Sequence, residues 1–266
     1  MRHLFKHISV VAFAMILAAC GGGGDDPPPA AATATPTSTS TPTGTTPTPT
    51  PTAAPAVTIE GAYAGVAAGG AGSWRMLVLE NSETHLGLGT NDSNGAFTPS
   101  AWIKGTTAVT GNGSFVTTFD GGRMQGTFDG NNLSGTLALD GSDQPIAITI
   151  AKSEVSGYDY NQPPQASSVT GNWRVATGAV ITISPFNTGG RFSLTNGTCT
   201  ATYTLTPRPS GKNLFNIATV GSGTCAGATG RGLALTYRDT ANNQHLMMHL
   251  EVDDLDDSGV VIVARR

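Results

Sequence analysis

Charge is scarce in this chain of 266 residues, since only 12% of them are Asp, Glu, Lys or Arg. The sequence has no basic patch with interleaved aromatic residues, which argues against nucleic acid as a partner. It also lacks long stretches with the 3.6-residue apolar period of helices. Glycine is abundant at 35 residues, and Thr, Ser and Asn are frequent. This composition suits many short strands joined by tight turns.

Long apolar runs are missing too. The run near the amino end, residues 8–17, is too short to cross a hydrocarbon core of ~30 Å, which needs about 20 residues. It follows a basic start with Arg2 and Lys6 and leads into the small residues Ala18 and Ala19. Charge, a short apolar core and small residues form the pattern of a secretory signal.

Cys20 follows directly after Leu17-Ala18-Ala19, and this motif resembles the lipobox of bacterial lipoproteins. The resemblance implies that residues 1–19 are cut off, that Cys20 carries a thioether-linked diacylglycerol, and that its new amino terminus is acylated. Two or more acyl chains give stable anchoring. In Gram-negative lipoproteins an Asp after the cysteine favours inner-membrane retention, so Gly21 implies an outer-membrane location. An ordinary signal cleaved by a different peptidase is the alternative.

Cysteine is otherwise limited to Cys199 and Cys225. An even pair in an exported chain indicates a disulfide. Closing a loop of this size is worth roughly 3 kcal/mol in the chain-entropy model. Two free thiols are the alternative. Removal of the signal takes Arg2 and Lys6 from the 14 basic residues, which leaves 12 against 18 acidic ones.

Residues 20–56 are expected to form a disordered tether rich in Thr and Pro. The segment has almost no apolar surface to bury, so it cannot offset its conformational entropy. Proline-rich linkers favour an extended form at ~3.1 Å per residue, so about 35 residues reach up to ~100 Å. The tether would hold the folded part away from the lipid surface.

The remainder divides into two similar β units, residues 57–152 and 169–266, separated by a polar linker at 153–168. Strands are expected at residues 59–66, 74–80, 85–89, 101–109, 114–119, 123–128, 133–139 and 146–150, and then at 172–176, 180–184, 191–194, 199–206, 213–219, 232–237, 245–252 and 260–265. Asp-Gly pairs such as Asp120-Gly121 and Asp140-Gly141 are strong hairpin signals. We therefore predict an all-β fold of two small antiparallel up-and-down barrels in tandem, with sandwiches as the alternative.

The two units start alike, with Gly61-Ala62-Tyr63 and Gly171-Asn172-Trp173. Gly-x-Trp on a first strand, with a basic residue on the last, resembles the calycin superfamily, which includes the lipocalins. The resemblance implies that Trp173 packs against Arg265 at one end of the second barrel. Period two places Val261, Val263 and Arg265 on one strand face, so Arg265 lies at the barrel mouth if that face points inward.

Two further resemblances concern the whole layout. The chain resembles uncharacterised two-domain outer-membrane lipoproteins of Gram-negative bacteria. The glycine-punctuated segment at residues 126–135 is similar to the barrel domains of transferrin-binding-type surface lipoproteins.

His245 and His249 have the spacing of metal ligands on a helix, but their surroundings predict a strand. On a strand they lie ~13 Å apart at ~3.3 Å per residue, which is too far to chelate one ion. The segment at residues 254–259 partly matches a calcium loop, yet its twelfth position is Arg265 rather than Glu. A solvated hairpin turn is the favoured interpretation, and no metal is expected.

A catalytic constellation is not evident. Ser222 lacks the leading glycine of Gly-x-Ser-x-Gly. Glu80, Glu83, Asp120 and Asp129 fall at expected turns or strand ends, and the glycine cluster at residues 69–72 precedes a strand rather than a phosphate-binding helix.

We therefore expect no cofactor and a non-enzymatic binding or interaction module of the cell envelope, with a protein or small ligand as its partner. A carrier of a small apolar ligand and a hydrolase of envelope polymers are the alternatives. A hollow barrel would favour the carrier, convergent carboxylates in a cleft would favour the hydrolase, and filled barrels with an exposed apolar or aromatic patch would favour the binding module.

Overall fold

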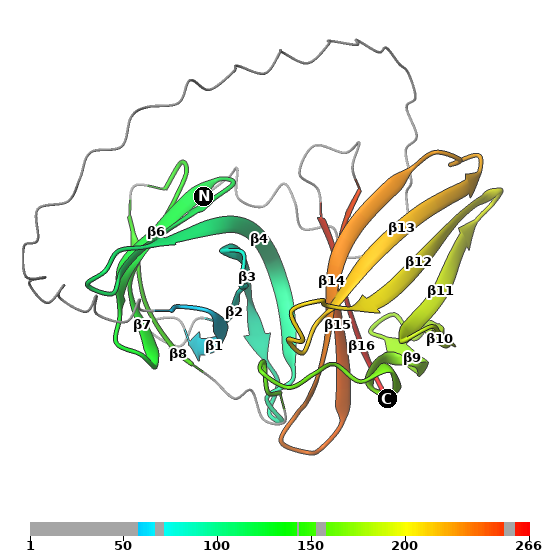
Figure 1. The fold of residues 1–266 in the computed structure, drawn as a ribbon, viewed down its shortest axis with the longest axis horizontal. Coiled ribbons are helices and arrows are strands. Elements are labelled where there is room, and N and C mark those ends of the chain that lie inside the picture. Colours follow the sequence, from blue (N-terminus) through cyan, green and yellow to red (C-terminus); the bar gives the residue numbers. More distant parts are fainter. Residues whose placement is uncertain (1–57, 67–71, 143, 153–157, 253–258) are drawn as a thin grey trace, which may run out of the picture. The chain divides into compact units, whose positions relative to one another are not determined.

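The computed structural model describes residues 58–66, 72–142, 144–152, 158–252 and 259–266. These residues contain sixteen strands and one short helix. The strands form two closed eight-stranded barrels, in each of which neighbouring strands of the sequence pair and the last strand pairs with the first (Figure 1). All the strand pairs are antiparallel, so the prediction of two tandem up-and-down barrels is confirmed, and the sandwich alternative is not.

The first barrel, drawn from blue to green in Figure 1, consists of β1 to β8. Its strands are β1 (Gly61–Val66), β2 (Ser73–Val78), β3 (Glu83–Asn91), β4 (Phe97–Val109), β5 (Ser114–Phe119), β6 (Gly122–Phe128), β7 (Asn132–Leu139) and β8 (Ile146–Lys152).

The second barrel, drawn from green to red in Figure 1, follows the helix α1 (Ala166–Val169). Its strands are β9 (Gly171–Val175), β10 (Val180–Phe186), β11 (Gly189–Asn196), β12 (Cys199–Pro207), β13 (Phe215–Gly223), β14 (Thr229–Arg238), β15 (Gln244–Val252) and β16 (Gly259–Arg265).

The β5–β6 hairpin shows why short-range signals place the strands so well. Phe119 pairs with Gly122, which leaves Asp120-Gly121 as a two-residue loop. Gly121 has φ of 81°, a backbone region that favours glycine. Along β6 the burial then alternates, with Met124 buried and Arg123 exposed, as expected for a strand with one face to the core.

Side chains fill the interior of both barrels. The core of the first barrel includes Met76, Leu86, Phe115, Met124, Leu137 and Ile150. The core of the second includes Trp173, Ile183, Phe192, Leu205, Phe215 and Met248.

A third cluster of buried side chains contains residues of both barrels. Its members include Leu77, Leu79, Phe97, Tyr158, Tyr160, Leu214, Leu235, Tyr237 and Met247. Tyr158 and Tyr160 come from the stretch at 153–168, which was expected to be a polar linker, and both are buried. The described part of that stretch therefore packs against the barrels in addition to joining them, and helix α1, which was not expected, begins in it at Ala166.

Polar contacts also connect the two barrels. Arg208 Nε lies 2.7 Å from Glu80 Oε1, and Lys212 Nζ lies 2.8 Å from Glu60 Oε1. The backbone N–H of Phe97 donates to the Tyr237 hydroxyl at 3.1 Å.

A group of ionisable side chains lies in the same junction. The ring of His85 is 5.6 Å from that of His249. His85 bonds to Glu83 at 3.0 Å and accepts a hydrogen bond from Trp102 Nε1 at 3.3 Å. Lys104 bridges Glu83 and the second barrel's Glu251.

Within the part of the chain that the structure describes, no helix has the length and hydropathy needed to span a bilayer. The predicted signal, Cys20, the tether at 20–56 and the calcium-like residues 254–258 all lie outside the described residues.

Candidate functional site: an arginine-lined cleft

Trp173 closes one end of the second barrel. Its side chain is fully buried, and its indole N–H donates to the Val169 carbonyl at 2.6 Å. The guanidinium that lies over its ring, 4.5 Å from the centroid, belongs to Arg266. The prediction that Arg265 takes this place is therefore wrong, although an arginine does cover the ring.

The reason is the orientation of β16. Ile262 and Ala264 pack into the core of the second barrel, whereas Val261 and Val263 pack into the cluster shared with the first barrel. Since side chains alternate along a strand, the position after Arg265 continues the inner face. The two-residue period of β16 is as predicted, but the face that carries Val261, Val263 and Arg265 lies outside the barrel.

Arg266 is fixed in position by several acceptors. Its Nε donates to Gln244 Oε1 at 2.9 Å, its Nη2 donates to the Ser167 carbonyl at 3.0 Å, and its Nη1 donates to the Thr170 carbonyl. Burial lowers the pKa of Arg266, and the nearby charge of Arg238 lowers it further. A guanidinium with so high an ordinary pKa nevertheless stays charged.

Around Arg266 the surface forms an open cleft of about 260 Å³, lined by Arg174, Asn243, Arg265 and Arg266. Closure of the barrel creates this concentration of charge, because Arg174 in β9 and Arg265 in β16 are direct cross-strand partners. Like charges placed directly opposite each other destabilise a sheet.

The arginines of this cleft differ from four of the basic residues elsewhere in the described chain. Arg208, Lys212, Lys104 and Arg231 all form ion pairs with glutamates. Among the described residues, no carboxylate forms an ion pair with Arg174, Arg238, Arg265 or Arg266.

Asp239 is the acidic residue next to Arg238, but its oxygens are already engaged. They accept hydrogen bonds from the Asn243 backbone and side chain and contact His245 Nε2 at 2.9 Å. Burial tends to raise the pKa of Asp239, while the bonds with Asn243 and His245 outweigh it and hold the pKa at about 2. Asp239 is therefore ionised but directed toward its own turn.

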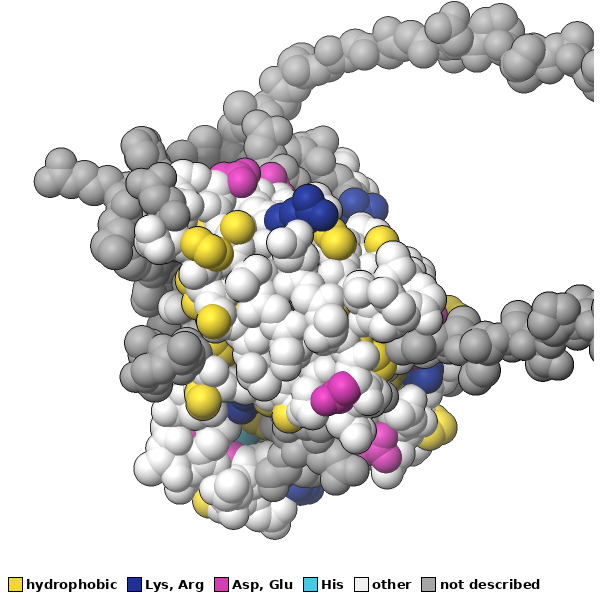
Figure 2. Space-filling view, turned by 90° about the vertical axis from the view of Figure 1, so that its left-hand side faces the viewer, with side chains coloured by type: hydrophobic (Ala, Val, Ile, Leu, Met, Phe, Trp, Pro, Cys, Tyr) yellow, Lys and Arg dark blue, Asp and Glu magenta, His cyan; other side chains and the backbone are white. Residues whose placement is uncertain are grey.

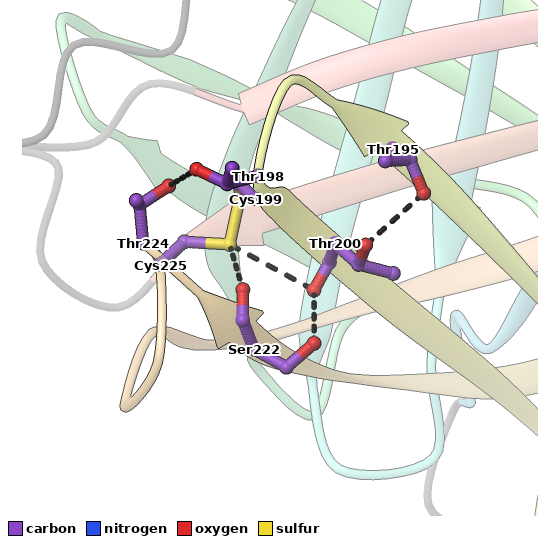
Figure 3. The surroundings of a disulfide bond; sticks show 7 residues. All are labelled: Thr195, Thr198, Cys199, Thr200, Ser222, Thr224 and Cys225. Carbon is purple, nitrogen blue, oxygen red and sulfur yellow. Dashed lines mark hydrogen bonds between the residues drawn. A yellow bond between two sulfur atoms is a disulfide. The ribbon is translucent and has the colours of Figure 1, made fainter.

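The predicted disulfide is confirmed. Cys199 and Cys225 are bonded, with their Cα atoms 5.1 Å apart. The bond ties the start of β12 to the turn after β13, and Cys225 Sγ lies 3.1 Å from the Ser222 carbonyl oxygen (Figure 3). The Ser222 hydroxyl donates to the Thr200 carbonyl at 3.2 Å (Figure 3), so its proton is directed to the backbone and not to a histidine.

The other candidates take part in local contacts. His245 and His249 both lie in β15, as the strand interpretation requires, and each contacts different groups: Asp239 for the first and His85 for the second. In the described ranges no group of three or more His, Cys, Asp or Glu side chains is arranged to hold a metal ion.

The carboxylates named from the sequence do not converge. Glu80 pairs with Arg208, and Glu83 pairs with His85 and Lys104. Asp120 lies in the β5–β6 loop, and Asp129 accepts hydrogen bonds from Asn131 and Asn132 in its own turn.

Sequence reasoning missed Arg174, Arg266 and Asn243 as parts of one site. A signal for two of the cleft residues was present: a closed barrel pairs its first and last strands, so basic residues at 174 and 265 had to approach one another. By fold and site, the chain is a tandem β-barrel protein with a cationic cleft at the seam of its second barrel. Comparison with protein-family models, curated proteins and solved structures gives no match.

Proposed function

We propose that the chain is a cell-envelope lipoprotein, anchored in the outer membrane through Cys20, that acts as a non-enzymatic binding or interaction module. The observation that carries the binding role is that both barrels are filled, so that surface features remain for recognition. The disulfide supports export, because such bonds persist in oxidising compartments.

The carrier alternative finds less support. One cavity, lined by side chains of both barrels that include Tyr63, Met76 and Tyr237, has a volume of only about 30 Å³. Ligand pockets usually measure ~300–1,000 Å³. A hydrolase finds less support as well, because Glu80 and Glu83 are paired with cations in place of facing a common cleft.

The surface feature best suited to recognition is charged rather than apolar. On the face shown in Figure 2, hydrophobic side chains are scattered among uncharged polar ones and backbone. The large hydrophobic residues that are exposed in the described chain are four valines on four different strands, Val66, Val180, Val220 and Val260. The apolar or aromatic patch expected of a binding module is thus not found among the described residues, and the arginine-lined cleft is the more distinctive feature.

The anchor is tested by labelling cells with palmitate and fractionating their membranes. The wild-type chain should take up label and sediment with outer membranes, whereas Cys20→Ala should be unlabelled and either soluble or uncleaved. The Cys199→Ser/Cys225→Ser variant is the matched control, and it should still be labelled. Label in Cys20→Ala would refute the anchor.

The carrier alternative is tested separately with a fluorescent fatty acid. Filled barrels should not take it up, so its fluorescence should not change on addition of the purified chain. Saturable uptake with one probe per barrel would favour the carrier in place of the binding module.

A further inference from the structure

We infer that the cleft lined by Arg174, Asn243, Arg265 and Arg266 is a binding site for a phosphate group carried by a larger molecule. This inference names the ligand chemistry of the binding module proposed above, and so rests on that role, but it does not depend on the lipid anchor. The site is built from the two strands that close the second barrel, together with the turn before β15.

The first step is the concentration of charge. The chain has 14 basic and 18 acidic residues, yet three arginines line one cleft and Arg238 lies close enough to influence the pKa of Arg266. Arginine does not relieve repulsion by losing its proton. The cross-strand pair Arg174–Arg265 therefore places two like charges side by side.

The second step is the supply of free donors. Arg174 donates one hydrogen bond, from Nη1 to the Gly178 carbonyl at 3.3 Å. Within the described residues, the Arg265 side chain has neither a hydrogen bond nor an ion pair, and both side chains are exposed. A guanidinium has five N–H donors, so both arginines keep most of theirs for a ligand.

The third step is that Arg266, in the same cleft, is held in position. Arg266 stacks on the buried Trp173 and is held by Gln244, Ser167 and Thr170. Because these contacts already hold the guanidinium, less side-chain conformational entropy is lost when an anion binds there.

The fourth step is the chemistry of the anion. A guanidinium presents two parallel N–H groups that match a pair of oxygens on carboxylate or phosphate. A phosphate monoester offers three acceptor oxygens and a charge of about −1.5 to −2. Two or more guanidinium groups around one cleft are better matched by phosphate than by a single carboxylate.

The cleft is large enough for a phosphate group that is attached to a larger molecule. A water molecule occupies ~30 Å³ in the liquid, so about 260 Å³ accommodates a phosphate together with part of the molecule that carries it. A soluble phosphate ester and a lipid headgroup share this chemistry.

The test uses the purified full-length chain, with sodium pyrophosphate as the soluble probe and sodium chloride at equal ionic strength as the reference. Calorimetric titration should show pyrophosphate binding, and pyrophosphate should raise the melting temperature, because a ligand of the native state stabilises it. Arg174→Gln and Arg265→Gln should each weaken binding at least tenfold. Arg123→Gln is the matched control, an exposed arginine on β6 of the first barrel, and it should bind as the wild type does.

Folding is checked in the same experiment. Without ligand, Arg174→Gln and Arg265→Gln should melt at or above the wild-type temperature, because each removes a like-charge contact. Arg266 is left unchanged, since it also covers Trp173.

A second arm separates the two sources of phosphate. Vesicles of phosphatidylcholine with phosphatidic acid are compared with vesicles of phosphatidylcholine alone, in a flotation assay of the unlipidated Cys20→Ala chain. Flotation with phosphatidic acid that disappears in Arg174→Gln/Arg265→Gln supports a lipid phosphate, and pyrophosphate binding without flotation supports a soluble ester. Binding to neither probe, or binding that the double variant retains, overturns the inference and leaves the anchor and the broader binding role standing.

Discussion

Tyr63 in β1 and Trp173 in β9 make the same contact in their two barrels. Each is buried and donates a side-chain hydrogen bond to the carbonyl of the residue four positions earlier, Ile59 for the tyrosine and Val169 for the tryptophan. The likeness between the starts of the two units, noted from the sequence, thus corresponds to a shared hydrogen bond from a buried aromatic side chain to the backbone that precedes the first strand of each barrel.

We predict that Trp173→Ala lowers the free energy of unfolding by ~3–5 kcal/mol, as for other buried aromatic residues. Trp173→Phe should cost less than Trp173→Ala. It still removes the hydrogen-bond donor of the Val169 carbonyl, and leaving that acceptor unpaired costs ~1–3 kcal/mol. Tyr63→Phe is the matched variant in the first barrel and should lie in the same range. Urea denaturation measures all three, and a Trp173→Ala cost below that of Trp173→Phe would contradict the packing role.

The disulfide gives a second prediction. Cys199→Ser/Cys225→Ser should lower the free energy of unfolding by roughly 3 kcal/mol, because the unfolded chain regains the freedom of a loop whose ends are 26 residues apart. Reduction of the wild type should produce the same loss, and reduction of the double variant should produce none. Equal stability of oxidised and reduced wild type would rule out a stabilising role for the bond.

His249 predicts a loss of stability in acid. Burial, and then the charge of His85, lower its pKa from the ordinary 6.5 to about 4, with Lys104 acting in the same direction and Glu251 and Glu83 against it. The unfolded chain therefore binds more protons than the native one between pH 6.5 and 4, so the free energy of unfolding falls as the pH drops through this window, by about 1–3 kcal/mol.

The measurement is urea denaturation at several pH values. In His249→Leu the decline between pH 6.5 and 4 should be smaller than in the wild type, and identical slopes would exclude His249 as its source. The pKa of Glu83 is held below its ordinary value, first by its hydrogen bond with His85, so both proteins should lose further stability below about pH 4.5.

The shared buried cluster predicts that the two barrels unfold together. Tyr237 belongs to the second barrel, yet its hydroxyl accepts the N–H of Phe97 from the first. Tyr237→Ala should therefore lower the free energy of unfolding by about 3 kcal/mol and separate one transition into two. In the Trp173→Phe background only Trp74 and Trp102 remain, so tryptophan fluorescence reports on the first barrel. The unfolding curves measured by fluorescence and by circular dichroism should coincide for chains that keep Tyr237.

Much of the fold could be predicted from local signals. Strand β5 was expected at residues 114–119 and occupies Ser114–Phe119, because an Asp-Gly turn fixes its end and alternation fixes its faces. Tyr158 and Tyr160 were harder to place, since aromatic residues in a polar stretch find their partners only when both barrels have formed.

The error at Arg265 has a specific physical cause. Both faces of β16 are apolar, because Ile262 lies on the barrel side while Val261 and Val263 meet the shared cluster. Alternation divides such a strand into two faces but does not indicate which one points inward. Prediction of the cleft also requires the pairing of β9 with β16, which no local sequence pattern contains.

The pairing of first and last strands has a further consequence. β1 pairs with β8, and β9 pairs with β16, so the polypeptide enters and leaves each barrel at one seam. A unit with adjacent ends can be copied in tandem by inserting a short connection, without re-threading any strand. Each barrel is for the same reason a natural candidate for circular permutation, in which the seam is joined and the chain reopened at another turn, such as the one between β11 and β12.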